Sequence, residues 1–140
     1  MSTKIRFGEI ESLPPAKSGI YEIHTDEGIP LKIGIGKDIR KRLLQHRASK
    51  QQRLRLKVRG NRENPNDVES KQSILAKHLY YDRSIATNYD LTTEEGRQAF
   101  LLDKCHIVFE ITSTRAYAQE LELALEHPKN FRYVGRVLIR

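Results

Sequence analysis

Residues 18–47 read SGIYEIHTDEGIPLKIGIGKDIRKRLLQHR, and this stretch decides the fold. The run 18–24 is β-prone and ends at 25–28, a cluster of turn-forming residues. From residue 31 to residue 36, apolar side chains alternate with other residues, as a half-buried strand requires. The two runs therefore predict an antiparallel β-hairpin whose turn centres on residues 26–27.

A turn at this place sets the register of the hairpin. It puts Tyr21 opposite Lys32, and side chains in such a pair have Cβ atoms about 5 Å apart. Pro30 can lengthen the loop and shift this register. A phenol beside an ammonium has its phenolate form favoured, which makes the pair a candidate base. An ordinary cross-strand contact is the alternative interpretation.

A helix follows the hairpin and adds a second group of candidate residues. Asp38 is a suitable N-cap for a helix that runs to about residue 48. Its apolar stripe consists of Ile39, Leu43 and His46. Arg42 lies beside this stripe, between the predicted core and a cationic face, which distinguishes it from the other basic residues nearby.

The remaining chain predicts three more helices and a third strand for the sheet. Helical periodicity covers residues 67–81, 92–104 and 113–126, and strand alternation covers residues 106–112. We therefore predict one α+β domain over residues 1–140, with a small, mainly antiparallel three-stranded sheet flanked by helices.

The positive charge of the chain is concentrated in one segment. The whole chain carries a net charge of +7, whereas residues 37–62 contain eleven basic residues and one acid. Alternation over residues 53–59 predicts a strand with one cationic face. Such a block is typical of a surface that binds a polyanion, and a solvated charged surface is the alternative.

Several classes of protein are excluded by composition. No run approaches the ~18 apolar residues of a membrane helix, and residues 1–6 lack the apolar region of a secretory signal. Cys105 is the only cysteine, which excludes a disulfide framework and a zinc site built on several cysteines. We therefore expect a cytoplasmic protein without a membrane partner.

One carboxylate on the predicted last helix stands out. The apolar stripe of this helix consists of Tyr117, Leu121, Ala124 and Leu125. Glu120 falls inside that stripe, whereas Glu122 and Glu126 fall on the polar side. A carboxylate on an apolar face is costly unless it is paired, protonated or bound to a cation. Glu120 is therefore the predicted functional carboxylate, and an ion pair at the edge of the stripe is the alternative.

These features occur in the order found in a known family. Gly-Ile-Tyr at residues 19–21, Lys-Ile-Gly at residues 32–34 and the helix around Arg42 resemble the GIY-YIG nuclease superfamily. The metal-binding glutamate of that family lies on a helix after the third strand, where Glu120 matches it. Pro128-Lys129-Asn130 resembles a version, one residue shorter, of the Pro-x-x-Asn element that often follows. The resemblance covers residues 18–47 and 105–130, which implies that residues 48–104 are an insertion, part basic and part helical.

The resemblance implies an enzyme, a DNA endonuclease that hydrolyses phosphodiester bonds with one Mg²⁺ or Mn²⁺. Glu120 would hold the metal, and Arg42 would bind the phosphate and stabilise charge in the transition state. Tyr21, assisted by Lys32, would activate or position the attacking water. The second tyrosine of the family is Lys32 here, as in some branches of the superfamily.

Further roles follow from the same resemblance. His46 and Asn130 are candidates for catalytic support, with core packing as the alternative for His46. The basic residues expected to hold the nucleic-acid backbone are Lys37, Arg40, Lys41, Arg47, Lys50, Arg53, Arg55, Lys57, Arg59 and Arg62. A symmetric target would call for a homodimer. The alternatives to a DNA endonuclease are a catalytically inactive DNA-binding module and an RNA-directed nuclease.

Overall fold

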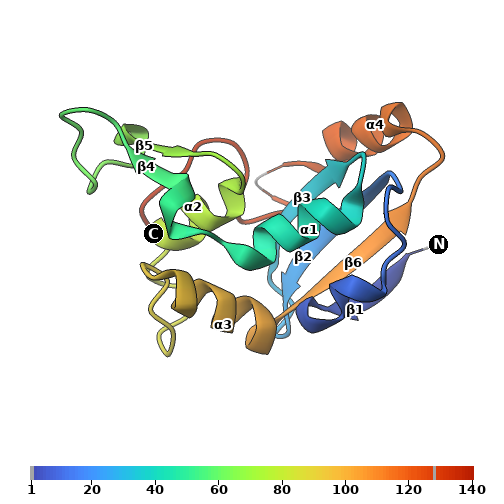
Figure 1. The fold of residues 1–140 in the computed structure, drawn as a ribbon, viewed down its shortest axis with the longest axis horizontal. Coiled ribbons are helices and arrows are strands. Elements are labelled where there is room, and N and C mark those ends of the chain that lie inside the picture. Colours follow the sequence, from blue (N-terminus) through green and yellow to red (C-terminus); the bar gives the residue numbers. More distant parts are fainter. Residues whose placement is uncertain (1, 128) are drawn as a thin grey trace.

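The computed structural model of the chain describes residues 2–127 and 129–140. Its main feature is a four-stranded antiparallel sheet in the order β1-β6-β2-β3, with helices packed against it (Figure 1). The strands are β1 (Thr3–Arg6), β2 (Gly19–Thr25), β3 (Pro30–Gly36) and β6 (Cys105–Ile111). The α+β prediction is confirmed, but the sheet has one strand more than predicted. β1 was missed because Ile5 is its only apolar residue, too little for a visible alternation.

Four α-helices accompany the sheet in the described chain. They are α1 (Ile39–Ala48), α2 (Ile74–Tyr81), α3 (Glu94–Lys104) and α4 (Arg115–Leu125). Each follows an N-cap whose side-chain oxygen accepts a backbone N–H of the first turn. These caps are Asp38, Ser73, Thr93 and Thr114. Short 3₁₀ turns are η1 (Phe7–Ser12), η2 (Gln51–Arg53) and η3 (Pro65–Asp67).

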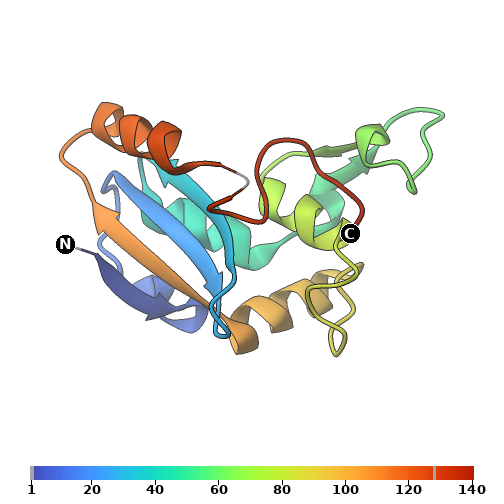
Figure 2. The same cartoon turned by 180° about the vertical axis from the view of Figure 1, so that it is seen from behind.

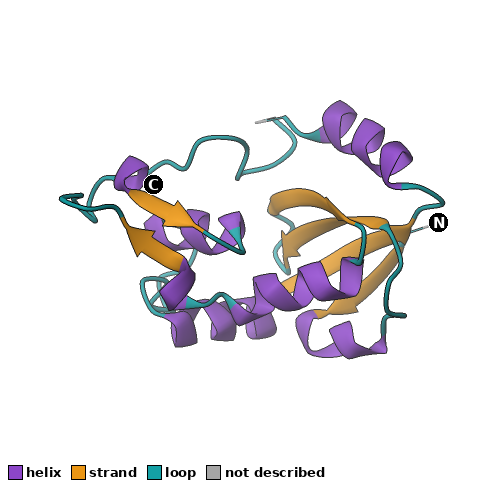
Figure 3. Cartoon of the chain, turned by 45° about the horizontal axis from the view of Figure 1, so that its top comes forward, coloured by secondary structure: helices purple, strands orange, loops and turns teal. Residues whose placement is uncertain are grey.

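The region between α1 and α2 contains less regular structure than predicted. Strands β4 (Leu54–Leu56) and β5 (Val68–Ser70) form a separate two-stranded antiparallel sheet. The predicted strand over residues 53–59 ends early, because the chain turns at Lys57–Gly60. The predicted helix over residues 67–81 begins late, at the Ser73 cap. Figure 3 shows this small sheet and the four-stranded sheet at opposite ends of the molecule.

The hairpin of β2 and β3 has two more residues than predicted, one in the turn and one in a bulge between the strands. Its turn centres on residues 26–27, because the Gly28 N–H donates to the Thr25 carbonyl at 2.9 Å. Gly28 then takes a φ of 98°, in the left-handed region that glycine favours, and adds one residue to the loop. A bulge between residues 23 and 24 adds the second.

These two additions correct the predicted pairing. Tyr21 lies opposite Gly34, and Lys32 lies opposite Ile23. Because side chains alternate with a period of two, a shift of two positions keeps Tyr21 and Lys32 on the same face of the sheet, as diagonal neighbours. Gly34 has a visible role in this arrangement, since a Cβ there would collide with the Tyr21 hydroxyl. The missing side chain leaves space for the phenol.

The two faces of the sheet have separate cores. On the Tyr21 face, strand residues pack against α1 and α3, with Leu43 and Leu101 fully buried. On the other face, Ile20 and Ile33 pack against Ala118 of α4 and Phe131 of the C-terminal segment. Figure 2 shows the molecule from behind, with α4 and the C-terminal segment in red tones. None of the helices in residues 2–127 and 129–140 has the length and apolar character of a membrane span.

Candidate active site

A chain of hydrogen bonds starts at Tyr21 and crosses to α1 and α2. The Tyr21 hydroxyl lies 2.6 Å from Nε2 of His46, and Nδ1 of His46 lies 2.7 Å from Oγ of Ser73. The Ser73 oxygen also accepts the N–H of Ala76 at 3.1 Å, as the N-cap of α2. All three side chains of this chain are buried. The bonds therefore fix the orientation of both the phenol and the imidazole.

The ionisation of Tyr21 differs from the predicted one. Burial raises the pKa of Tyr21 to about 12, against the opposing effect of the Arg42 guanidinium. The predicted phenolate beside Lys32 is therefore wrong for the free protein, in which the phenol is neutral. Burial also holds the pKa of His46 well below its usual value, and the positive charges of Arg42 and Lys32 act in the same direction. The pair is thus a neutral phenol bonded to a neutral imidazole.

Arg42 lies next to this pair, and its charge acts on both Tyr21 and His46. It is one helical turn before His46 on α1, so the two side chains share a face of the helix. The guanidinium donates from Nη1 to Oε1 of Gln45 at 3.2 Å and to the backbone carbonyl of Gln72. The second bond ties Arg42 to the segment that leads into α2, which holds its cationic group beside Tyr21.

Lys32 supplies a second positive charge from β3. It is half-buried, and burial lowers its pKa, while the carboxylates of Glu126 and Glu122 act to raise it. Within residues 2–127 and 129–140, its ammonium has no hydrogen bond and no ion pair. A cation held in this way has its donors available for an anionic ligand.

The carboxylates whose charges act on this cluster are Glu122 on α4 and Glu126 at the C-cap of the same helix, four residues apart. Glu122 is half-buried, and burial raises its pKa, as does the Glu126 carboxylate, with Lys32 opposing. Its charge also acts on Tyr21. A partly desolvated carboxylate beside a second carboxylate is stabilised by a bound cation.

Glu120 was predicted to lie inside the buried stripe of the last helix, and this prediction is wrong. Glu120 is exposed, and so are Tyr117, Ala124 and Leu125 of the predicted stripe, whereas Ala118 is the fully buried residue of α4. The helix is rotated relative to the predicted orientation because it packs on β2 and β3 through a narrow strip around Ala118, on the sheet face opposite Tyr21. The four-residue spacing of Glu122 and Glu126 is the feature of the sequence that could have indicated a pair of carboxylates on one face of this helix.

Several other predicted residues have structural partners. Arg47 forms an ion pair with Glu11 at 2.5 Å, and Arg62 donates to the Leu54 carbonyl at 3.4 Å, inside the small sheet. Asn130 is exposed and donates from Nδ2 to the Leu125 carbonyl at 2.8 Å, at the end of α4. The structure therefore accounts for these three without a ligand. Pro128, beside Asn130 in the expected motif, lies outside the described residues.

The remaining basic candidates differ in exposure. Arg40 is half-buried, and its Nε is a buried nitrogen without a hydrogen-bond partner in the described residues. The exposed candidates are Lys37, Lys41, Lys50, Arg53, Arg55, Lys57 and Arg59. They extend from the start of α1 to the small sheet of β4 and β5, so part of the basic segment lies far from Tyr21 (Figure 1).

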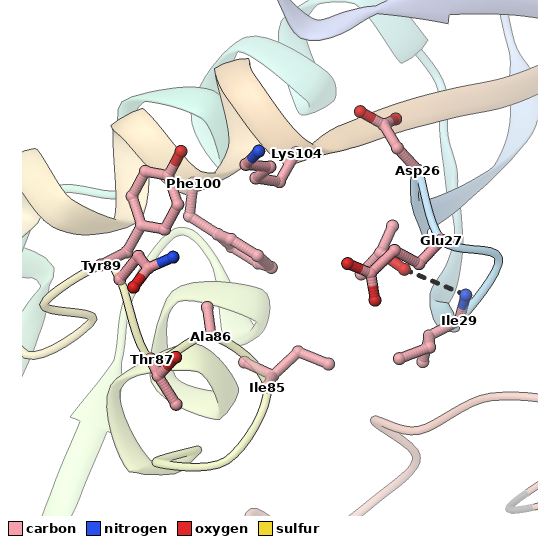
Figure 4. Close-up of a pocket in the computed structure, with 11 residues that line it drawn as sticks. Asp26, Glu27, Ile29, Ile85, Ala86, Thr87, Tyr89, Phe100 and Lys104 are labelled. Carbon is pink, nitrogen blue, oxygen red and sulfur yellow. Dashed lines mark hydrogen bonds between the residues drawn. The ribbon is translucent and has the colours of Figure 1, made fainter.

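A separate cavity of about 220 Å³ lies between the β2–β3 turn, residues 85–89 and α3 (Figure 4). Ile85 and Phe100 form an apolar part of its wall, and Glu27 and Lys104 are charged lining residues. Tyr21, Lys32, Arg42 and His46 do not line it. The cavity is therefore distinct from the candidate active site.

The described residues offer two carboxylates for a magnesium ion, Glu122 and Glu126, and not a complete set of protein ligands. The described chain has no cluster of three or more His, Cys, Asp or Glu that could hold a metal. Mg²⁺, however, is commonly bound by one or two carboxylates together with waters and substrate phosphate. Glu122, with Glu126 beside it, meets that requirement once a phosphate is bound.

Comparisons with protein families, with curated proteins and with solved structures find no match for this chain. The functional assignment therefore depends on the residues of the site and on their geometry.

The buried histidines predict a loss of stability in acid. Burial lowers the pKa of His78 to about 4, and it holds the pKa of His46 well below 6.5. Below about pH 6.5 the unfolded chain takes up protons that the folded chain does not bind, so the free energy of unfolding falls. We expect each histidine to contribute a slope of about 1.4 kcal/mol per pH unit between roughly pH 6 and pH 4. Urea unfolding at pH 7 and pH 5 measures this loss.

The control variant is His78→Phe, which keeps a ring against Tyr133, on which His78 stacks at 4.9 Å. We expect a smaller fall in unfolding free energy between pH 7 and pH 5 for this variant. An identical fall in variant and wild type would contradict the assignment of His78 as a buried neutral group.

Proposed function

We propose that the protein is a metal-dependent endonuclease that hydrolyses phosphodiester bonds in DNA. The observation that carries the proposal is the buried hydrogen bond between Tyr21 of β2 and His46 of α1, with two cations and one carboxylate whose charges act on this pair. The cations are Arg42 of α1 and Lys32 of β3, and the carboxylate is Glu122 of α4. The exposed cations between α1 and β4 support nucleic acid as the substrate.

Arg42 and Lys32 would bind the scissile phosphate. Two cations whose charges act on the Tyr21–His46 pair match a dianion-like transition state, in which negative charge grows on the phosphoryl oxygens. Arg42 is held in place by its bonds to Gln45 and to the Gln72 carbonyl, so little reorganisation is needed. Lys32 approaches from β3 with its ammonium donors available.

Tyr21 and His46 would handle the proton of the attacking water. Water gives its proton to the Tyr21 oxygen while the phenol proton passes to Nε2 of His46, 2.6 Å away. This requires the tautomer with a proton on Nδ1, which donates to Ser73. Burial, and after it the charges of Arg42 and Lys32, lower the pKa of His46 in the free protein, and the single negative charge of a bound phosphodiester offsets part of the effect of these two cations. Substrate binding therefore makes His46 a better base.

Glu122 would hold the divalent ion, with Glu126 beside it. The ion would supply charge neutralisation at the phosphate and the leaving oxygen, as Mg²⁺ or Mn²⁺ does in many phosphoryl-transfer sites. Glu120 has no part in this proposal, since it lies on the exposed side of α4.

The proposal is tested by incubating supercoiled plasmid and DNA from several genomes with the protein and Mg²⁺. We expect nicked or linear products from wild type and none in EDTA. Arg42→Ala should lose cleavage while the neighbouring Lys41→Ala, an exposed basic residue on the same helix, keeps it. Binding of DNA without cleavage on every substrate would favour the inactive DNA-binding module, and cleavage of RNA alone would favour the RNA-directed nuclease.

A further inference from the structure

Strands β4 and β5 form an arm at the opposite end of the molecule from α4, which we call the ribbon (residues 53–71; Figure 1). Its inner face is apolar, because Leu54 and Val68 pack against Ala76 and Tyr81 of α2. The outer face is exposed and carries Arg53, Arg55 and Lys57 on β4 and its extension. The ribbon is thus fastened to the body on one face and presents a basic surface on the other.

Acidic residues neutralise only part of this outer face. Glu69 lies opposite Arg55 and forms an ion pair with Lys71 at 2.9 Å. Asp67, which ends η3 just before β5, uses its carboxylate to accept the backbone N–H of Asn61 at 2.9 Å. Lys57, at the far end of the ribbon, has no ion pair within residues 2–127 and 129–140.

The loop that closes the ribbon is held by its own hydrogen bonds. The Lys57 N–H donates to the Asp67 carbonyl at 2.8 Å, which extends the ladder by one pair. The Gly60 N–H donates to the Lys57 carbonyl at 2.9 Å and closes a tight turn. Asn64 fixes the other part of the loop, with its side chain accepting the Asn66 N–H at 3.0 Å. The turn is therefore preorganised.

The turn presents an unusual pair of residues to solvent. Val58 is 93% exposed, and Arg59 has a φ of 59°, in the left-handed region that a residue with a side chain rarely adopts. Local hydrogen bonding keeps both in place, although neither packs on the protein. Val58 is thus an apolar side chain held between two cations, Lys57 and Arg59, at the end of a rigid turn. This arrangement is complementary to a partner surface with anionic groups at its edges and apolar groups between them.

We propose that the ribbon docks on B-form DNA with the Lys57–Gly60 turn in the major groove, its cations on the flanking phosphates and Val58 against the base edges. The major groove of B-form DNA admits a two-stranded ribbon, and its thymine methyl groups offer apolar contact. The major groove of A-form RNA is too deep and narrow for side chains to read. The inference rests on the proposed function for its choice of DNA as partner, and it does not require cleavage.

Binding in the absence of divalent metal tests the ribbon separately from the nuclease. The full chain is titrated onto labelled duplex DNA at several salt concentrations, with fluorescence anisotropy as the readout. For Arg59→Asn, which tolerates the left-handed turn, we expect the slope of log K against log salt to fall in magnitude by about 1. For Val58→Ser we expect binding about threefold to tenfold weaker at every salt concentration, with the slope unchanged.

The control is Leu123→Ser, another strongly exposed apolar residue, which lies on α4 and should leave binding unchanged. Wild-type affinity in the Val58→Ser variant, or equal binding of duplex RNA, would overturn the groove assignment. A protein that binds as expected but never cuts DNA would uphold the ribbon and contradict the proposed function alone.

Discussion

Glu122→Gln is expected to lower DNA cleavage by about 10³-fold or more at a fixed Mg²⁺ concentration. Holding the ion beside the phosphate supplies several kcal/mol to the transition state, and each 1.4 kcal/mol is about tenfold in rate. Glutamine has the same size but no charge, so it loses the ion without creating a cavity. The carboxyl pKa of Glu122 is raised by burial, and neutralising it should leave the fold intact. Single-turnover cleavage at increasing Mg²⁺ measures the effect.

The matched control is Glu120→Gln, which removes the same charge two residues away on the exposed side of α4. We expect this variant to cleave DNA within about twofold of wild type, since surface carboxylates contribute little. Loss of cleavage in Glu120→Gln with normal cleavage in Glu122→Gln would contradict the placement of the metal and restore the prediction from the sequence.

Tyr21→Phe is expected to lower the cleavage rate by about 10²-fold to 10⁴-fold, the usual contribution of a positioned proton-transfer group. The ring remains, and only the hydroxyl that lies 2.6 Å from His46 is lost. Substrate binding should change little, because Arg42 and Lys32 are untouched. The expected result is therefore a large fall in kcat with a nearly constant KM.

The control for this prediction is Tyr89→Phe. The Tyr89 hydroxyl donates to Asp103 at 3.1 Å, so this variant also loses one tyrosine hydrogen bond, beside the separate cavity. It should keep full activity. A Tyr21→Phe protein as active as Tyr89→Phe would show that the hydroxyl takes no part in the reaction.

The hairpin and α1 could be predicted from the sequence because their signals are local. Alternation in residues 31–36 and the Asp38 cap define β3 and α1 without help from the rest of the chain. These signals also brought Tyr21, Lys32 and Arg42 into one region. The register was harder, because the added Gly28 and the bulge at residues 23–24 depend on how β3 starts at Pro30.

The orientation of α4 could not be predicted from its own periodicity. Tyr117, Leu121 and Leu125 look like a core stripe, but α4 packs on β2 and β3 mainly through Ala118 and leaves Tyr117 48% and Leu125 40% exposed. Where a helix buries only a few side chains, tertiary packing decides which carboxylate faces the protein. In α4 this carboxylate is Glu122 and not the predicted Glu120. Ser73 escaped notice for a related reason, since its bond to His46 crosses 27 positions of the chain.

Cleavage of DNA in isotope-labelled water tests the central claim most directly. Wild-type protein is incubated with DNA and Mg²⁺ in water carrying heavy oxygen, under single-turnover conditions, and the new ends are analysed by mass spectrometry. The account predicts cleavage that depends on the metal, with one labelled oxygen on each new phosphate. DNA that is bound yet uncut at every Mg²⁺ and Mn²⁺ concentration, or phosphate ends without label, would contradict it.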